Sequence, residues 1–220
     1  HDPAREEPRA RAGAAGPQAV TASSAPARTA VVDQGDAVLA NVAWWTLTGA
    51  HARFAAGRGG ARRYRGGFAP ILGFADPQRP EFGALWADCA PGERLFCDGW
   101  SGATPAGWRI DGQSTLLKMV WEGPWPAPTA DGATPVRLGA VHMPMATQLA
   151  TFAGLAPFGP RSIELGEMLG VFDGVQLVAM AGERMQAQGL REVSGVCTHP
   201  AHRGRGHARR LVLALLRQQL

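Results

Sequence analysis

The C-terminal stretch 190–220 constrains the fold more than any other part of the chain. An apolar, β-branched run over 190–198 predicts a strand, and Pro200 ends it. A loop of glycine and arginine over 203–208 follows, and an apolar stripe spaced at i, i+3, i+4, i+7 and i+8 predicts a helix from there onward. Glycines let the loop curl, and the first N–H groups of a helix have no carbonyl partner within it. With the positive end of the helix dipole, these groups predict an anion site that suits a pyrophosphate.

Composition divides the rest of the chain into segments. With 220 residues, the chain can form one large or two small domains. The first segment is rich in alanine, arginine and proline without apolar periodicity, which is typical of disorder. A later segment contains Pro124, Pro126 and Pro128, which is typical of a linker. We therefore expect a disordered tail over 1–36, an N-terminal α+β lobe over 37–122, a linker over 123–132 and a second domain over 133–220.

Apolar patterns predict short elements in both lobes. The first lobe is expected to hold a helix that begins near Val38, a loop over 51–67 with some helix near His51, and strands over 94–98, 107–110 and 116–121. The second is expected to hold a strand at 136–138, a helix over 143–152, a short helix capped by Ser162, and strands over 168–172 and 177–185. Asp173-Gly174 is a strong signal for a hairpin between the last two strands.

The charge and the cysteines narrow the classes of protein. The formal net charge is +4, Lys118 is the only lysine, and the arginines are scattered, which argues against a nucleic-acid-binding surface. Cys89, Cys97 and Cys197 are odd in number and lack C-x-x-C spacing, which argues against zinc and a disulfide framework and fits a reducing cytoplasm. No segment approaches the roughly 18 apolar residues of a membrane span, and the N-terminus lacks the apolar core of a signal peptide.

The loop over 203–208 fits the pattern Arg/Gln-x-x-Gly-x-Gly/Ala through Arg203, Gly206 and Ala208. It resembles the coenzyme-A loop of the GNAT N-acetyltransferase superfamily, and the predicted order of strand, helices, hairpin, third strand, loop and helix agrees. The segments 170–174, 177–185 and 196–200 look like one bacterial subgroup. The resemblance, specific over about 160–220, implies an α/β (α+β) GNAT fold with a mixed, mostly antiparallel sheet and flanking helices. A smaller irregular α+β lobe precedes it.

This resemblance implies an acyltransferase that moves the acetyl group of acetyl-CoA to an amine by direct attack. The backbones of Val196 and Thr198 match the positions that hydrogen-bond the pantetheine arm. The N–H of Val196 would polarise the thioester carbonyl, which gains negative charge during attack. The implied cofactor-binding residues are Val196, Thr198, Arg203, Gly204, Arg205, Gly206, His207 and Ala208, with acetyl-CoA as cosubstrate and no metal.

A general base is expected at Glu192, eleven residues before Arg203, where many GNAT enzymes carry a glutamate. The chemistry needs a base because a lysine-like amine has a pKa of about 10.4 and must lose a proton before it attacks. Period-two alternation places Glu192, Ser194, Val196 and Thr198 on one face, with Cys197 pointing to the other as a core residue. Other carboxylates stay open as the base or as substrate contacts: Glu164, Glu167 and Glu183.

Competing interpretations of the loop fail on spacing. A dinucleotide fingerprint needs a glycine where Arg209 stands, and a Walker loop needs Gly-Lys-Ser/Thr. The histidines of this region, at 199, 202 and 207, do not form an i, i+4 pair, so they do not predict a metal site. The tryptophans are expected to pack in the core and linker rather than to form a stacking platform; these are Trp44, Trp45, Trp108, Trp121 and Trp125.

The GNAT fold normally continues past this helix with another strand and a helix that often brings a tyrosine acid. The chain stops at Leu220, and its only tyrosine, Tyr64, lies in the other lobe. We therefore expect the C-terminal half of the fold to be absent and the third strand to keep a free edge. Two alternatives stay open, a non-catalytic acyl-CoA-binding protein and an arginine-driven nucleic-acid binder. The expected partner is an amine on a small molecule, protein or peptide, met in the cytoplasm; the sequence gives neither its identity nor the oligomeric state.

Overall fold

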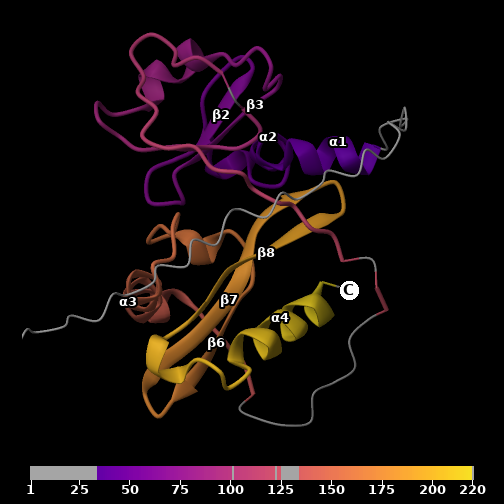
Figure 1. The fold of residues 1–220 in the computed structure, drawn as a ribbon, viewed down its shortest axis with the longest axis vertical. Coiled ribbons are helices and arrows are strands. Elements are labelled where there is room, and N and C mark those ends of the chain that lie inside the picture. Colours follow the sequence, from indigo (N-terminus) through magenta and orange to yellow (C-terminus); the bar gives the residue numbers. More distant parts are fainter. Residues whose placement is uncertain (1–33, 101, 122, 125–133, 220) are drawn as a thin grey trace, which may run out of the picture. The chain divides into compact units, whose positions relative to one another are not determined.

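The computed structural model describes residues 34–100, 102–121, 123–124 and 134–219, and these hold two four-stranded sheets (Figure 1). The helices are α1 (Gln34–Ala40), α2 (Val42–Thr48), α3 (Met143–Ala153) and α4 (His207–Gln218), with 3-10 turns at Ala52–Phe54, Phe82–Asp88, Ala140–His142, Ser162–Glu164 and Pro200–His202. The strands are β1 (Ala55–Ala56), β2 (Ala61–Tyr64), β3 (Ile71–Phe74), β4 (Phe96–Cys97), β5 (Val136–Arg137), β6 (Met168–Asp173), β7 (Gln176–Ala187) and β8 (Leu190–Thr198).

The N-terminal sheet is small and has the order β1-β2-β3-β4. Its first three strands are antiparallel, whereas β4 runs parallel to β3. Helix α2 packs on β2 and β3. Gly73 permits this close approach, because a Cβ at that position would lie 2.7 Å from the backbone nitrogen of Trp44. The backbone of α2 therefore packs directly against the backbone of β3 at Gly73.

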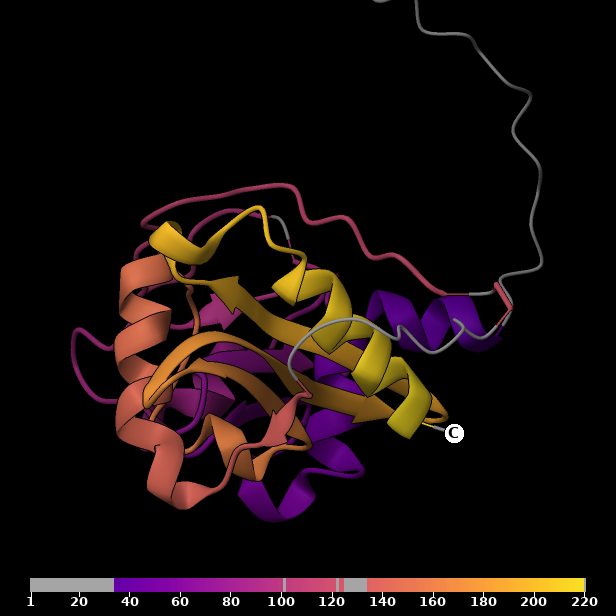
Figure 2. The same cartoon turned by 90° about the horizontal axis from the view of Figure 1, so that it is seen from below.

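The C-terminal sheet has the order β5-β6-β7-β8 and is antiparallel throughout. Alternation along β6 sends Met168 into a cluster beneath α3 and Leu169 into a cluster beneath α4, so the two helices cover opposite faces (Figure 2). Leu211 and Leu215 of α4 are completely buried in the second cluster. Strand β7 is thus buried on both faces along much of its length, whereas most residues of β8 are half-buried.

The described residues belong to one compact unit, and a shared core joins the two sheets. Leu47 of α2, Tyr64 of β2 and Ile71 of β3 pack in one cluster with Leu165 and with Met185 of β7. The far end of β7 therefore belongs to the core of the N-terminal lobe as well as to its own sheet.

The C-terminal predictions hold closely. The strand over 190–198 has the predicted bounds, and the last helix begins at His207. The hairpin also forms, but its turn residues are Gly174 and Val175, because Asp173 still pairs with Gln176 in the sheet. Ser162 was expected to cap a short helix, but its hydroxyl instead accepts a hydrogen bond from the Gly159 N–H at 2.9 Å. The expected tail over 1–36 lies mostly outside the described residues, and 34–36 already belong to α1. Most of the expected linker also lies outside them.

The strands predicted over 107–110 and 116–121 are wrong. Neither segment pairs with a strand, and the side chains of Leu117 and Met119 are 81% and 90% exposed. Lys118 holds the second segment, because its Nζ donates to the Ala40 carbonyl at 2.9 Å and pairs with Asp98 at 2.5 Å. A β-type composition forms a strand only where a neighbour completes its hydrogen bonds.

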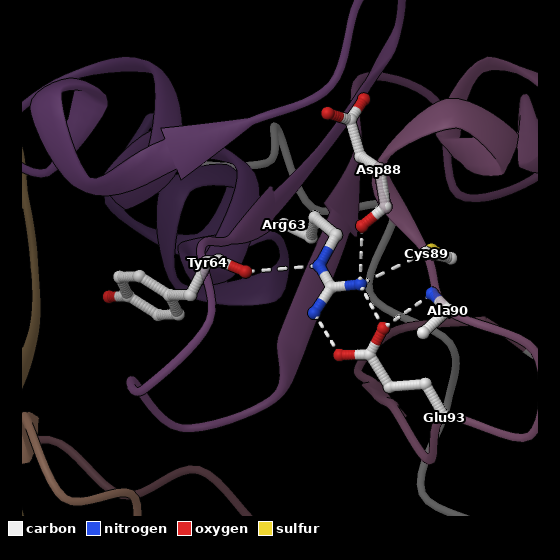
Figure 3. A network of polar contacts seen from close by, with 6 residues as sticks. All are labelled: Arg63, Tyr64, Asp88, Cys89, Ala90 and Glu93. Carbon is white, nitrogen blue, oxygen red and sulfur yellow. Dashed lines mark hydrogen bonds and ion pairs between the residues drawn. The ribbon is translucent and has the colours of Figure 1, made fainter.

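Strand β2 escaped prediction because its sequence, ARRY, contains two arginines. Arg63 is buried, and Figure 3 shows how its guanidinium is satisfied. It donates to the carbonyls of Tyr64 at 3.0 Å and Asp88 at 2.7 Å, and it forms a two-pronged ion pair with Glu93. Glu93 also accepts from the Ala90 N–H at 3.1 Å. A charge is tolerated here because every direction of the guanidinium meets an acceptor.

Replacing Arg63 by methionine should destabilise the N-terminal lobe strongly. The variant removes the guanidinium that pairs with Glu93 and donates to two carbonyls, which costs about 2–4 kcal/mol of unfolding free energy. Urea unfolding followed by circular dichroism measures the change. Arg79→Met is the matched control, because Arg79 pairs with Asp76 at the surface and its loss should change little. Equal unfolding midpoints for the two variants would contradict this role of Arg63.

Candidate functional site

A groove of about 460 Å³ lies where β8 ends and α4 begins. All the residues predicted to bind the cofactor line it, and Ala153, His202 and Arg209 complete the lining together with Cys197. The end of β8 is held on β7 where the chain enters the groove, because the His199 N–H donates to the Val178 carbonyl at 2.8 Å. The structure therefore brings the end of β8 and the loop over 203–208 to one surface.

The register between β7 and β8 shifts beside this groove. Ser194 lies opposite Gly182 and Cys197 opposite Met180, so Gly195 and Val196 together face a single position on β7. Gly195 has a φ of 62°, a left-handed conformation that glycine adopts without steric cost. Such a β-bulge leaves a residue outside the ladder of hydrogen bonds. Val196 is consequently 37% exposed, at the wall of the groove.

The bulge overturns the expected alternation along β8. In a regular strand Val193 and Cys197 would share a face, but Val193 packs in the cluster beneath α4 and Cys197 in the cluster beneath α3. The expected common face is therefore wrong beyond the bulge; it comprised Glu192, Ser194, Val196 and Thr198. Cys197 is buried as expected of a core residue, and burial raises the pKa of its thiol to about 11. It stays protonated near neutral pH.

Helix α4 begins with open N–H groups. Gly206 adopts a left-handed conformation with a φ of 75°, and no side chain caps the helix. The first helical hydrogen bond is donated by the Arg210 N–H to the Gly206 carbonyl at 3.1 Å. The N–H groups of residues 207–209 precede it and have no carbonyl partner in the helix. They line the groove at the positive end of the helix dipole.

Positive charge surrounds these open groups. Arg203, Arg205 and Arg209 line the groove, and none of the ion pairs within residues 134–219 involves them. Arg203 is oriented by a hydrogen bond from its Nε to the Thr198 carbonyl at 3.3 Å. Burial lowers the pKa of His207, and the charges of Arg210 and Arg205 lower it further. The surroundings thus disfavour an added positive charge and favour an anion.

His202 connects the groove to the β6–β7 hairpin. Its Nδ1 is buried and lies 3.7 Å from the Asp173 carboxylate, beyond hydrogen-bonding distance of any described group. His199 accepts from the Ala201 N–H at 3.3 Å and packs edge-on against Phe152. Among the described residues there is no group of three or more His, Cys, Asp and Glu side chains that could hold a metal ion.

Glu192 lies outside the groove lining and has one close partner, which the sequence did not indicate. Arg184 on β7 donates two hydrogen bonds to the Glu192 carboxylate, from Nε at 3.1 Å and from Nη2 at 2.5 Å. The pair is partly buried, with 22% and 29% of the two side chains exposed. It follows from the pairing of β7 with β8, which brings Arg184 across from Glu192. The carboxylate is therefore held in a fixed orientation.

The other candidate carboxylates have structural partners of their own. Glu183 accepts from Gln219 at 2.9 Å and from the Glu167 N–H at 3.3 Å, which ties β7 to the end of α4. Glu167 pairs with Arg137, and Glu164 pairs with Arg161, which lowers the pKa of Glu164. None of the three lines the groove.

Tyr64 unexpectedly reaches the second lobe. Its hydroxyl lies 2.8 Å from His51 Nδ1 and donates to the Arg184 carbonyl at 3.4 Å. Both side chains are almost completely buried, and burial raises the pKa of Tyr64 and lowers that of His51. The sequence offers no signal for this contact, because its members are far apart along the chain. It links the N-terminal lobe to the strand that carries Glu192's partner.

The family and the solved structures give a consistent comparison. A family model described as FR47-like protein matches residues 168–219. A protein from Novosphingobium aromaticivorans that is assigned to the GNAT family of acetyltransferases aligns with a TM-score of 0.67 and 29% identity, over 82% of this chain and 81% of its own. A GCN5-related N-acetyltransferase from Kribbella flavida aligns over 44% of this chain and 38% of its own, at 26% identity and a TM-score of 0.31, too low for a structural argument. Among curated proteins there is no significant match.

The chain is similar to GNAT acetyltransferases in its family match and over most of its length in the Novosphingobium structure, and it has their mixed α/β fold with mostly antiparallel sheets. The family match runs from β6 to the end of α4, so it contains the bulge and the groove loop. At this general level the family indicates an acyltransferase that acts on amine-bearing substrates. No helix in the described parts of the chain is long and apolar enough to span a membrane.

Acidic pH should destabilise the protein through His51. An unfolded histidine has a pKa near 6.5, and burial lowers that value in the folded state. Between the two values the unfolded chain binds more protons, so the free energy of unfolding falls as the pH drops below about 6.5. Urea midpoints from pH 7.5 to pH 5 should decrease, and His51→Gln should flatten this slope. His207→Gln should preserve most of it, because His207 lies nearer the surface. An unchanged slope in His51→Gln would rule out this assignment.

Proposed function

We propose that the protein transfers the acetyl group of acetyl-CoA to an amine and holds the cosubstrate in the groove between β8 and α4. One observation carries the proposal: the bulge at Gly195 and Val196 and the open N–H groups of α4 line the same groove. A backbone N–H at the bulge can stabilise a carbonyl oxygen that gains negative charge, and the open N–H groups of α4 can bind phosphate. Acyl transfer from coenzyme A requires both.

The groove residues fit coenzyme A by their chemistry. The N–H groups of Arg205, Gly206, His207 and Ala208 would hold the pyrophosphate, and the Arg203 guanidinium adds charge. Among the described strands, β8 pairs only with β7, so its other edge offers backbone donors and acceptors. The backbones of Val196 and Thr198 would bind the extended, amide-containing pantetheine arm along that edge.

Acetyl-CoA supplies an activated acetyl group when bound. The amine nitrogen attacks the carbonyl carbon and a C–N bond forms. The C–S bond then breaks and releases the coenzyme-A thiolate, which takes up a proton from water. The Val196 N–H, freed by the bulge, would donate to the carbonyl oxygen as that oxygen gains charge. Glu192 would take the proton that the amine must lose. Arg184 keeps the Glu192 carboxylate oriented, and Tyr64 contacts the Arg184 backbone, so both are positioning residues.

A bulky side chain at Gly206 should block coenzyme-A binding. The position is left-handed with open space around it, so Gly206→Trp would fill the approach to the N–H groups of α4. Losing charge-assisted phosphate contacts should weaken coenzyme-A affinity by about tenfold or more in isothermal titration. Gly189→Trp in the β7–β8 turn is the matched control, because Gly189 is also left-handed with no atom near its Cβ position. Equal affinities for the two variants would refute the groove assignment.

Replacing Glu192 by glutamine should slow turnover without weakening coenzyme-A binding. Loss of a general base should lower kcat by about 10²–10⁴-fold, measured as thiol release from acetyl-CoA with a panel of primary amines. Glu164→Gln removes a surface carboxylate and should leave kcat unchanged. Unaltered turnover in Glu192→Gln would move the role to Glu183, Glu167 or a bound water. Coenzyme-A binding without turnover in the unmodified protein would instead favour a non-catalytic acyl-CoA-binding protein.

A further inference from the structure

A second cavity, of about 540 Å³, lies in the N-terminal lobe and shares no residue with the groove. It opens between the 3-10 turn Phe82–Asp88 and the loop that follows β4. Four aromatic rings line it, those of Phe82, Trp86, Trp100 and Trp108. Neither the proposed acetyl transfer nor the family comparison assigns a role to this pocket.

The rings are arranged as inclined walls rather than as a flat stack. The ring planes of Phe82 meet those of Trp100 and Trp108 at 69° and 58°, with centroids 5.0 and 5.3 Å apart. Trp86 and Trp108 meet at 50° over 6.0 Å. Since the rings face different directions, their electron-rich faces can surround one guest.

Trp86 is placed in a way that core packing alone does not explain. More than half of its surface, 54%, is exposed, although Phe82 beside it is buried. Gly107, with a φ of 79°, lets the indole lie against the backbone, because a Cβ there would stand 2.2 Å from the ring. The fold thus fixes a large aromatic face at the rim of a cavity.

The charge of the pocket favours a cation. Glu81 is the one ionisable side chain among the described lining residues, in a chain whose formal net charge is +4. Its carboxylate accepts from the Gly60 N–H at 3.1 Å, and it belongs to no ion pair among the described residues 34–121. The carboxylate is therefore held beside the backbone of Gly59 and Gly60, where it gives this side of the pocket a negative charge.

We propose that this aromatic pocket binds an organic ammonium cation, with the faces of Trp86, Trp100 and Trp108 around the alkylated nitrogen and Glu81 as its counter-charge. Aromatic faces attract a cation by their quadrupole, most strongly for tryptophan. The pocket is distinct from the acetyl-transfer groove, so this proposal stands or falls independently of that activity.

A pair of isosteric probes separates cation binding from apolar binding. Choline and neutral 3,3-dimethyl-1-butanol differ in replacing the quaternary nitrogen by carbon. Titration of the full chain, followed by tryptophan fluorescence, should give saturable choline binding that is about threefold to thirtyfold tighter than binding of the alcohol. Equal affinities, or no choline binding, would overturn the proposal. Binding of a proline-rich peptide without choline binding would also overturn it and identify a polyproline groove.

Variants locate the binding. Trp86→Leu should weaken choline affinity by about threefold to thirtyfold, while binding of the neutral alcohol changes less. The choline affinity of Trp86→Phe should lie between those of the unmodified protein and Trp86→Leu. Glu81→Gln should weaken choline alone. Trp45→Leu removes a half-exposed tryptophan of α2 outside the pocket and should have no effect. Unfolding midpoints and coenzyme-A affinity serve as checks on folding. Unchanged choline affinity in both Trp86→Leu and Glu81→Gln would refute the site.

Discussion

The start of α4 sets the constraint on which the site depends, because a helix cannot satisfy its own first N–H groups. Two anchors hold these groups in place. Leu211 and Leu215 fix the helix against the sheet, and the His199 N–H fixes the end of β8 on Val178. Between the anchors, Gly204 and Gly206 turn the chain with φ values of 78° and 75°. Packing on either side of the loop therefore holds the proposed anion site in place.

The proposed acetyl transfer also needs a free backbone donor for the thioester carbonyl, and we propose that β8 supplies it. A regular strand would commit all its N–H groups on that side to β7, whereas the bulge at Gly195 and Val196 releases one. The two lobes meet farther along the same hairpin, where the Tyr64 hydroxyl, hydrogen-bonded to His51, donates to the Arg184 carbonyl. Arg184 in turn orients Glu192. The N-terminal lobe thus has a physical connection to the proposed base, in addition to its own aromatic pocket.

The sequence predicted those features that local patterns determine. The strand over 190–198, the hairpin between β6 and β7 and the helix from His207 follow from alternation, turn chemistry and an apolar stripe. Features that depend on distant partners were out of reach. The segment over 116–121 has a strand-like composition but no neighbouring strand to pair with. Strand β2 contains the buried Arg63, whose partner Glu93 lies on a distant segment. The bulge in β8 has no recognisable sequence pattern. The expectation that Val196 and Thr198 share a face with Glu192 and Ser194 was therefore wrong. Trp108 was expected to pack in the core; it does so, but it also forms a wall of a cavity.

Backbone amide resonances test the central claim most directly, since that claim rests on N–H groups rather than on side chains. Coenzyme A titrated into the isotope-labelled full chain should shift the amides of residues 205–208 and of Val196, and should slow their hydrogen exchange. The left-handed turns at Gly174 and Gly189 should stay unchanged. Shifts confined to exposed arginine side chains, or centred on the aromatic pocket of the N-terminal lobe, would contradict the account.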